Sequence, residues 1–168
     1  FPDTLDLAGL KLVLDCANGA TYKIAPIIFS ELGAEVLTIN DHPNGLNIND
    51  RCGALDPREL ARRVLENGAD AGLAFDGDGD RLIVVDEQGR PLSGDHVIAC
   101  CAKAMKADGL LRNNLVITTP MSNLGFYQAM RQLDIHTEQT EVGDRYVLRM
   151  MREKGALLGG EPSGHIVF

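Results

Sequence analysis

The chain has 168 residues, and its content of 45% hydrophobic and 24% charged residues excludes a disordered or fibrous protein. The 24 acidic and 16 basic residues give a net charge of −8, which excludes general binding to a nucleic-acid backbone. Every apolar run is shorter than the ~18 residues of a membrane helix, and the first residues carry no export signal, so no membrane partner is expected.

Short apolar strands alternate with helices in the first half of the chain. The pattern predicts strands over 11–15, 34–39, 69–75 and 82–85. A first helix is expected to begin at Thr21 as its N-cap and to end at Leu32, because Gly33 is a typical helix terminator. A second helix is expected to begin with Asp56 as its N-cap and to end at Asn67.

The same alternation starts again after Ser93. Helices are expected over 95–106, 123–133 and 144–154, the last capped by Asp144, with strands over 115–119, within 136–142 and over 157–158. The sequence therefore predicts an α/β protein with two consecutive βαβ-type domains, 1–94 and 95–168, on mixed, mostly parallel sheets. A single seven-stranded doubly wound sheet would give the same order of elements and stays open as the alternative.

The cysteines and the two ends of the chain indicate the protein's context. Cys16, Cys52, Cys100 and Cys101 form no C-x-x-C motif, so reduced thiols in a cytoplasmic protein are expected. The chain has no initiator Met and ends in the apolar run 166–168, whereas natural termini are usually polar. We therefore expect a piece of a longer protein, with the second domain truncated at its C-terminus.

The most specific motif runs from Asp76 to Arg81, directly after an apolar strand, and carries aspartates at positions 76, 78 and 80. Three carboxylates in one short loop repel one another, so a bound cation is the natural way to hold them together. Carboxylate oxygens suit Mg²⁺, and Asp76, Asp78 and Asp80 are its expected ligands. An EF-hand is excluded because Arg81 replaces its required glycine and a strand follows.

Arg81 adds a planar, permanently charged donor group next to these carboxylates. Such a group is well matched to a phosphate oxygen that also contacts the metal. A metal together with an arginine makes this loop a candidate site for phosphoryl transfer.

A second candidate is the glycine-flanked loop 159–165. Glu161 could accept hydrogen bonds from two neighbouring hydroxyl groups, and Ser163 and His165 add polar contacts, so the loop suits a sugar or another polyol. An ordinary β-turn would also account for the same residues. Arg145, in the first turn of a predicted helix, is a third candidate that would face either a ligand or the solvent.

Three stretches in this order, 76–81, 142–147 and 160–165, resemble the α-D-phosphohexomutase superfamily. The stretches 143–147 and 121–125 are most similar to its bacterial phosphoglucosamine mutase branch, and the likeness extends over essentially the whole chain. The resemblance implies the second domain and much of the third domain of a four-domain enzyme. Such an enzyme interconverts hexosamine 6- and 1-phosphates through a phosphoserine and a bisphosphorylated intermediate.

The resemblance also implies a role for each candidate. Asp76, Asp78 and Asp80 would hold one Mg²⁺ that bridges to the phosphoserine, and Arg81 would lie against its phosphate. The substrate contacts would be Glu161, Ser163, His165 and Arg145. None of the chain's serines has the surroundings of the family's nucleophile, and the loop that binds the substrate phosphate is missing, so the chain alone is expected to be inactive.

Other functions stay open at this point. A phosphomannomutase or phosphoglucomutase of the same superfamily would share these motifs. A haloacid-dehalogenase-like phosphatase would use Asp76 as its nucleophile, although that motif prefers Thr or Val at the position of Asp80. A metal-dependent sugar-binding module without catalysis is the alternative from outside the enzymes.

Overall fold

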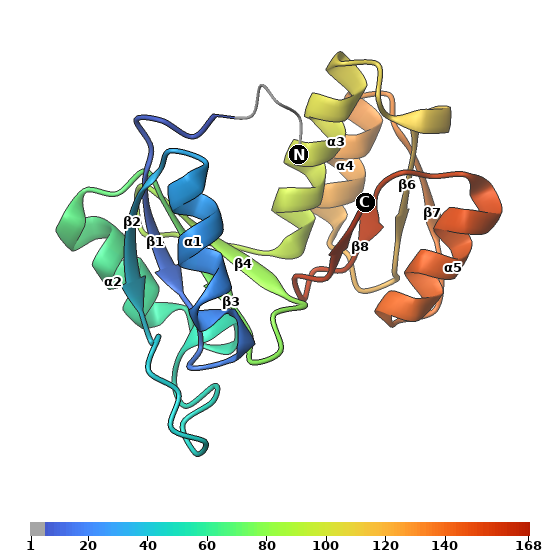
Figure 1. Cartoon of the computed structure of the whole chain (residues 1–168). Coiled ribbons are helices and arrows are strands. Elements are labelled where there is room, and N and C mark those ends of the chain that lie inside the picture. The colour runs from blue at the N-terminus through green and yellow to red at the C-terminus, as the bar shows by residue number, and fades with distance from the viewer. Residues whose placement is uncertain (1–5) are drawn as a thin grey trace. The chain divides into compact units, whose positions relative to one another are not determined.

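The computed structural model describes residues 6–168 and divides the chain into two compact units. The first unit ends at Leu92 and the second covers Ser93–Phe168. The break precedes Ser93, two residues before the expected boundary, because Ser93 is the N-cap of helix α3 (Gly94–Ala107). Each unit has its own sheet, which excludes the single doubly wound sheet and confirms the expected fold class (Figure 1).

The first unit contains a five-stranded sheet in the order β2-β1-β3-β4-β5. Its strands are β1 (Lys11–Asp15), β2 (Glu35–Ile39), β3 (Ala71–Phe75), β4 (Leu82–Asp86) and β5 (Pro91–Leu92). β1 pairs in parallel with β2 and with β3, whereas β4 is antiparallel to β3 and to β5. The carboxyl ends of β1, β2 and β3 therefore lie at one edge of the sheet.

Two helices cover the two faces of this sheet, α1 (Ile24–Glu31) and α2 (Arg58–Asn67). Successive side chains of a strand point to opposite faces. Leu12 and Leu14 accordingly pack in one apolar cluster with Ala25 of α1, while Val13 packs in another with Leu60 of α2. Burial on both faces explains why the three central residues of β1, Leu12–Leu14, are all apolar rather than alternating with polar residues.

The second unit has a four-stranded sheet in the order β7-β6-β8-β9. Its strands are β6 (Leu115–Thr118), β7 (His136–Gln139), β8 (Gly159–Gly160) and β9 (Ile166–Val167). Its helices are α3, α4 (Leu124–Gln132) and α5 (Asp144–Lys154). Short 3₁₀ turns at Ala20–Tyr22, Gly53–Leu55 and Arg112–Asn114 complete the two units.

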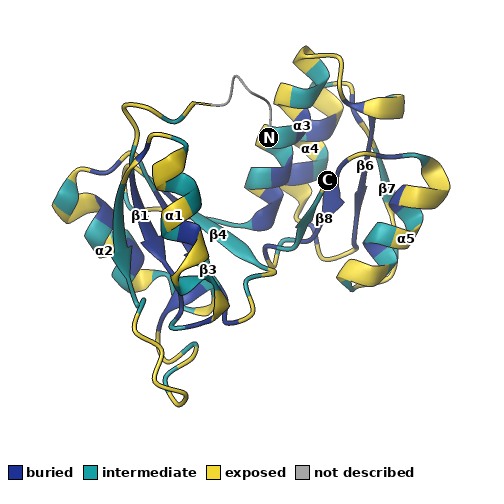
Figure 2. Cartoon of the chain, viewed as in Figure 1, coloured by how far each residue is buried: buried dark blue, intermediate teal, exposed yellow. Residues whose placement is uncertain are grey.

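The helices of the second unit also form two layers around their sheet. Val116 packs with Ile98 of α3 and Phe126 of α4, whereas Ile117 packs with Val147 of α5 on the other face. Figure 2 shows buried stretches on the strands and helices of this unit, with exposed stretches on the same helices. Among residues 6–168, no helix combines the length and the apolar character that crossing a bilayer requires.

Two expected helix starts in the first unit are wrong. Thr21 lies in a 3₁₀ turn rather than at a helix N-cap, because the neighbouring Ala20 N–H donates to the carbonyl oxygen of Gly77 at 2.8 Å. The N-cap of α2 is Pro57 rather than Asp56. Asp56 accepts only a long hydrogen bond, at 3.5 Å, from the N–H of Arg58, the first helical residue, and shorter ones from Nε and Nη2 of the same arginine, both at 2.6 Å.

Two local expectations in the second unit are also corrected. The N-cap of α5 is Gly143, and Asp144 is the first residue of the helix, with no capping hydrogen bond from its side chain. The strand expected over 157–158 lies at Gly159–Gly160, where Gly159 pairs with Ile117. The apolar pattern misplaced it because the fully buried Leu158 belongs to the core beside the strand.

The four cysteines are free thiols in different environments. Burial raises the pKa of both Cys16 and Cys52 to about 11. A thiol with that pKa is only roughly 0.1% thiolate at pH 8, and the thiolate is the reactive form. We therefore expect iodoacetamide at pH 8 to label the exposed Cys100 at least about 100-fold faster than Cys16 or Cys52.

Peptide mass spectrometry after timed labelling would measure these rates. In 6 M guanidinium chloride the difference should disappear, which is the control for intrinsic reactivity. Labelling of Cys16 in the folded chain as fast as Cys100 would contradict its burial.

Candidate functional site

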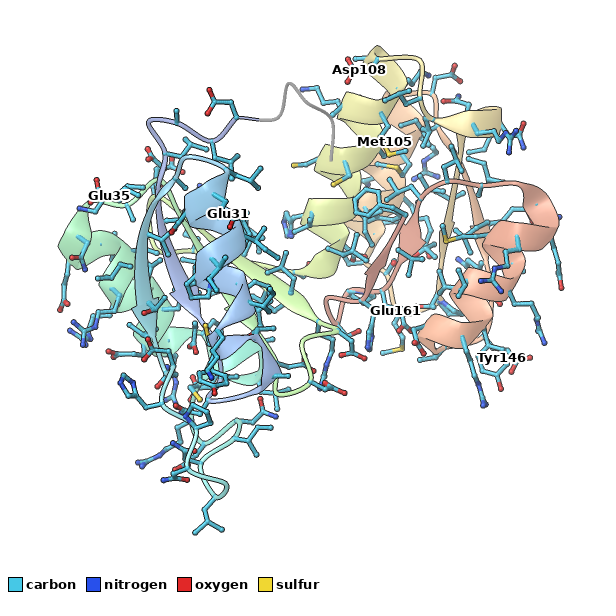
Figure 3. The ribbon with its side chains drawn as sticks, in the orientation of Figure 1. Glu31, Glu35, Met105, Asp108, Tyr146 and Glu161 are labelled. Atoms are coloured by element: carbon cyan, nitrogen blue, oxygen red, sulfur yellow. The ribbon has the colours of Figure 1, made fainter. Side chains whose placement is uncertain are left out.

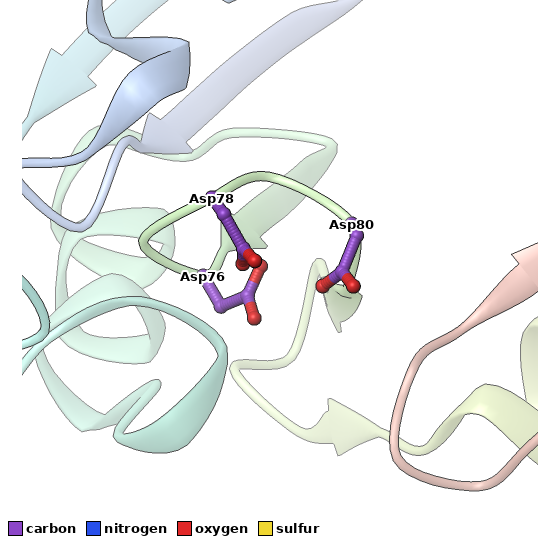
Figure 4. Close-up of side chains that lie close together, drawn as sticks. All are labelled: Asp76, Asp78 and Asp80. Carbon is purple, nitrogen blue, oxygen red and sulfur yellow. The ribbon is translucent and has the colours of Figure 1, made fainter. Parts of the chain in front are cut away.

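The three aspartates of the metal loop, defined as Asp76–Asp80, lie at the carboxyl end of β3 in the connection to the antiparallel strand β4. Asp76 is buried, while Asp78 and Asp80 are exposed. One oxygen of each carboxylate lies within 4.8 Å of the others. Figure 4 shows the three side chains converging from one turn of the backbone.

Asp76 is tied into the loop by its neighbours. Its Oδ1 accepts from the backbone N–H groups of Gly79 and Arg81, both at 3.1 Å, and its Oδ2 accepts from Nε of Arg81 at 2.7 Å. Burial opposes ionisation of Asp76, but the Arg81 side chain and the two backbone donors outweigh it and lower the pKa of this carboxyl. Asp76 is therefore a carboxylate at neutral pH, and Arg81 is oriented by it.

The donor set fits a hard divalent cation. Two negative charges within 4.8 Å of each other, as in this loop, repel by about 1 kcal/mol in water and by a few kcal/mol near a protein surface. Arg81 offsets part of this repulsion, since its Nε lies 2.7 Å from Asp76 and 4.0 Å from Asp80. Asp78 makes no hydrogen bond or ion pair with any of residues 6–168, so its carboxylate is available to a metal.

Two segments of the first unit hold the backbone of the metal loop. The turn after β1 contributes the hydrogen bond from Ala20 N–H to Gly77. The segment around residues 47–53 is the second, and the side chains of Ile48 and Asn49 contact Gly77. Gly53 has φ +68° and passes so close to β3 that a Cβ there would lie 2.4 Å from the Phe75 carbonyl oxygen.

The second candidate loop, which we call the sugar loop, covers 161–165 between β8 and β9 of the second unit. Glu161 is buried, whereas Ser163 is exposed and His165 is half-buried. The Nδ1 of His165 lies 3.2 Å from Oε2 of Glu161 and 3.3 Å from the Ser163 hydroxyl oxygen. The three predicted sugar contacts thus form one hydrogen-bonded group.

The structure joins this loop to the start of α5. Gly143 donates its N–H to Oε1 of Glu161 at 2.9 Å, so one oxygen of this carboxylate already has a backbone partner. Arg145 is exposed two residues later, with Nη2 donating to the hydroxyl of Tyr146 at 2.7 Å. Its guanidinium carbon lies 4.6 Å from the centre of the same ring. Glu161 and Tyr146 are labelled in Figure 3.

Sequence reasoning missed the residues that support the metal loop. The predicted elements leave 40–55 without a strand, helix or site residue, although Asn49 and Gly53 lie against the loop. A usable signal was present in the composition of this segment. Its asparagines and glycines favour left-handed backbone, and Asn40, Asn49 and Gly53 all have positive φ.

Comparisons with known proteins agree with this architecture. Residues 3–89 match phosphoglucomutase/phosphomannomutase, alpha/beta/alpha domain II, and residues 93–168 match alpha/beta/alpha domain III. A family protein from Burkholderia thailandensis has a similar structure, with a TM-score of 0.85 and 29% identity, over 95% of this chain and 35% of that chain.

Proteins named phosphoglucosamine mutase are similar to the whole chain. The one from Syntrophus aciditrophicus (strain SB) is 58% identical over 168 residues, which are 100% of this chain and 37% of that protein. The one from Geobacter sp. (strain M21) is 54% identical over the same shares. The chain thus spans little more than a third of the length of these relatives. Together with the two domain matches, this shows that the chain belongs to the phosphoglucomutase/phosphomannomutase family, in its domains II and III.

Proposed function

We propose that this chain is the central part of a phosphoglucosamine mutase, which interconverts glucosamine 6-phosphate and glucosamine 1-phosphate. The observation that carries the proposal is the 58% identity over the entire chain to a protein of that name. Membership of the phosphohexomutase family excludes the dehalogenase-like phosphatase considered from the sequence. The reaction would take place in the cytoplasm, without a nucleic-acid or membrane partner.

In this proposal the metal loop serves the phosphoryl group. Asp76, Asp78 and Asp80 would hold one Mg²⁺, which when bound would polarise the phosphoryl group and offset its negative charge. Arg81 would direct its terminal nitrogens to the same phosphate, because Asp76 holds its Nε. The nucleophilic serine would come from another domain of the same polypeptide.

The sugar loop would orient the hexosamine phosphate. Oε2 of Glu161 and the Ser163 hydroxyl can accept hydrogen bonds from sugar hydroxyls, and His165 can donate one. Arg145 is exposed at the adjoining helix start and would give a further substrate contact. Such contacts would align the sugar oxygen with the phosphoryl group, which is the main contribution that a protein makes to phosphoryl transfer.

The experiment compares glucosamine, glucose and mannose phosphates as substrates of the complete polypeptide that contains this chain. We expect kcat/KM to be at least about tenfold higher for glucosamine phosphate, which corresponds to about 1.4 kcal/mol. A preference for glucose or mannose phosphate would instead favour a phosphoglucomutase or phosphomannomutase. The absence of turnover with all three sugars would favour a sugar-binding module.

A further inference from the structure

Asp15, at the end of β1, is a buried carboxylate to which the proposed reaction gives no role. Its side chain is completely buried. Oδ1 accepts hydrogen bonds from Ala17 N–H at 3.0 Å and from Nδ2 of Asn40 at 3.1 Å, and Oδ2 accepts one from Gly53 N–H at 2.8 Å. A single carboxylate therefore joins three separate segments of the chain.

Burial of a charged carboxylate is unfavourable for the stability of the fold. Removing an ionised carboxylate from water is unfavourable unless well-placed hydrogen-bond donors replace the lost water contacts. Burial accordingly raises the pKa of Asp15, and the hydrogen bonds from Ala17, Gly53 and Asn40 act against that rise. An apolar residue could fill the same space without this cost, but it could not fix the positions of three donors.

The segments that Asp15 joins are those that support the metal loop. Ala17 begins the turn whose Ala20 N–H donates to Gly77. Gly53 lies against the carbonyl oxygen of Phe75, the residue before the first aspartate. The two segments also bond to each other, since Asn49 N–H donates to the Ala17 carbonyl oxygen at 2.9 Å.

We propose that Asp15 is a positioning residue for the metal loop. By fixing the turn after β1 and the segment around Gly53, it sets the backbone at Phe75 and Gly77, so that the three aspartates converge. This inference rests on the proposed metal site. Residues that hydrogen-bond to metal ligands typically contribute 10- to 100-fold to metal affinity, whereas Asp15 touches no aspartate of the metal loop and acts through the backbone that it holds at Ala17 and Gly53.

The test substitutes Asp15→Asn in the 168-residue chain and uses Mn²⁺ as the probe. Both oxygens of Asp15 accept hydrogen bonds, whereas asparagine has one oxygen and one NH₂ group. In either orientation the NH₂ group faces a donor, so at least one of the three hydrogen bonds to residue 15 is lost. Mn²⁺ broadens nearby amide signals in ¹H–¹⁵N NMR spectra, and the signals of Asp76–Arg81 report on the metal loop. We expect the Mn²⁺ concentration for half-maximal broadening to rise about tenfold in the variant.

The matched control is Asp86→Asn in the same unit. The carboxylate of Asp86 also accepts three bonds, from Gln88 N–H, Arg90 N–H and Nε of Arg90. Asp86 pairs with Ala71, at the opposite end of β3 from the metal loop. We therefore expect Asp86→Asn to lower stability like Asp15→Asn while leaving the Mn²⁺ response unchanged.

A milder variant keeps the test decisive if Asp15→Asn fails to fold. Asn40→Gly removes a single donor to Asp15 and suits the positive φ of +50° at that position. We expect it to raise the half-maximal Mn²⁺ concentration about threefold, in the same direction.

A wild-type Mn²⁺ response in folded Asp15→Asn, or in Asn40→Gly when Asp15→Asn does not fold, would overturn the positioning role alone. A lack of selective broadening at Asp76–Arg81 in the unsubstituted chain would overturn both the metal site and this inference. Equal weakening by Asp86→Asn would show a general loss of stability and would also overturn the inference.

Discussion

Asp78→Ala in the complete polypeptide should lower kcat at least about 100-fold while changing the free energy of unfolding by less than about 1 kcal/mol. The kinetic loss follows because a bound metal supplies several kcal/mol to phosphoryl transfer, and about 1.4 kcal/mol corresponds to a factor of ten. The small effect on stability follows because Asp78 is exposed and bonds to none of residues 6–168. Asp76 is a poorer choice, since it also binds Arg81.

The two measurements are steady-state kinetics with glucosamine phosphate in saturating MgCl₂ and unfolding in guanidinium chloride. Glu87→Ala is the control, because Glu87 is an exposed acid just after β4 and would be a metal ligand only if the loop were an EF-hand, whose twelfth position it occupies when Asp76 is the first. It should leave kcat within about twofold. Activity of Asp78→Ala close to that of the unsubstituted enzyme would remove Asp78 from the metal site.

Gly94→Ala should destabilise the second unit by about 2 kcal/mol and lower kcat/KM about 100-fold. Gly94 N–H donates to the Pro162 carbonyl oxygen at 3.0 Å, and a Cβ there would lie 2.1 Å from the Glu161 carbonyl oxygen. Two effects oppose each other. Alanine is a better helix former than glycine by roughly 1 kcal/mol, but the collision of its Cβ with backbone atoms, which cannot rotate away as a side chain can, costs about 3 kcal/mol. Relief of the collision requires a shift of the sugar loop, and a shift of about 1 Å can cost 100-fold in rate.

Gly125→Ala, in the first turn of α4, is the matched control. Its added Cβ would meet only Oδ1 of Asn123, at 3.0 Å; this oxygen caps α4 by accepting from Phe126 N–H, and a shift of a few tenths of an ångström relieves the contact without breaking that bond. We expect a stability change within about 1 kcal/mol and no kinetic effect. Urea titration monitored by NMR signals of the second unit measures both variants, and equal stability for Gly94→Ala and Gly125→Ala would refute the collision.

The strands and helices with a strong local pattern could be predicted from the sequence. β1 stands out because both of its faces are buried, so that its three central residues, Leu12–Leu14, are all apolar. The bounds of α5 were predicted correctly, since Gly155 ends it in a left-handed conformation. The convergence of Asp76, Asp78 and Asp80 could also be expected from the sequence, because three alternating acids directly after an apolar strand lie in one short loop.

The predictions that failed concern residues that bind partners distant in the sequence, or that bind a neighbouring side chain more closely than the helix end they were expected to cap. Thr21 is displaced from a cap because the adjacent backbone binds Gly77, more than 50 residues away. Asp56 makes its shortest hydrogen bonds to the Arg58 side chain, and its bond to the Arg58 N–H at the start of α2 is long, at 3.5 Å. The support of the metal loop by Asp15 and Gly53 depends equally on tertiary contacts, which periodicity does not encode.

The bond between Gly143 and Glu161 has a consequence for motion. Because the α5 N-terminus is tied to the sugar loop through one carboxylate oxygen, displacement of Glu161 must either break that bond or carry the helix along. Arg145 lies two residues into the same segment and would be carried with it. A ligand that pulls on the carboxylate would thereby also move the guanidinium. The exchange rate of the Gly143 amide proton with solvent reports directly on this mechanical link.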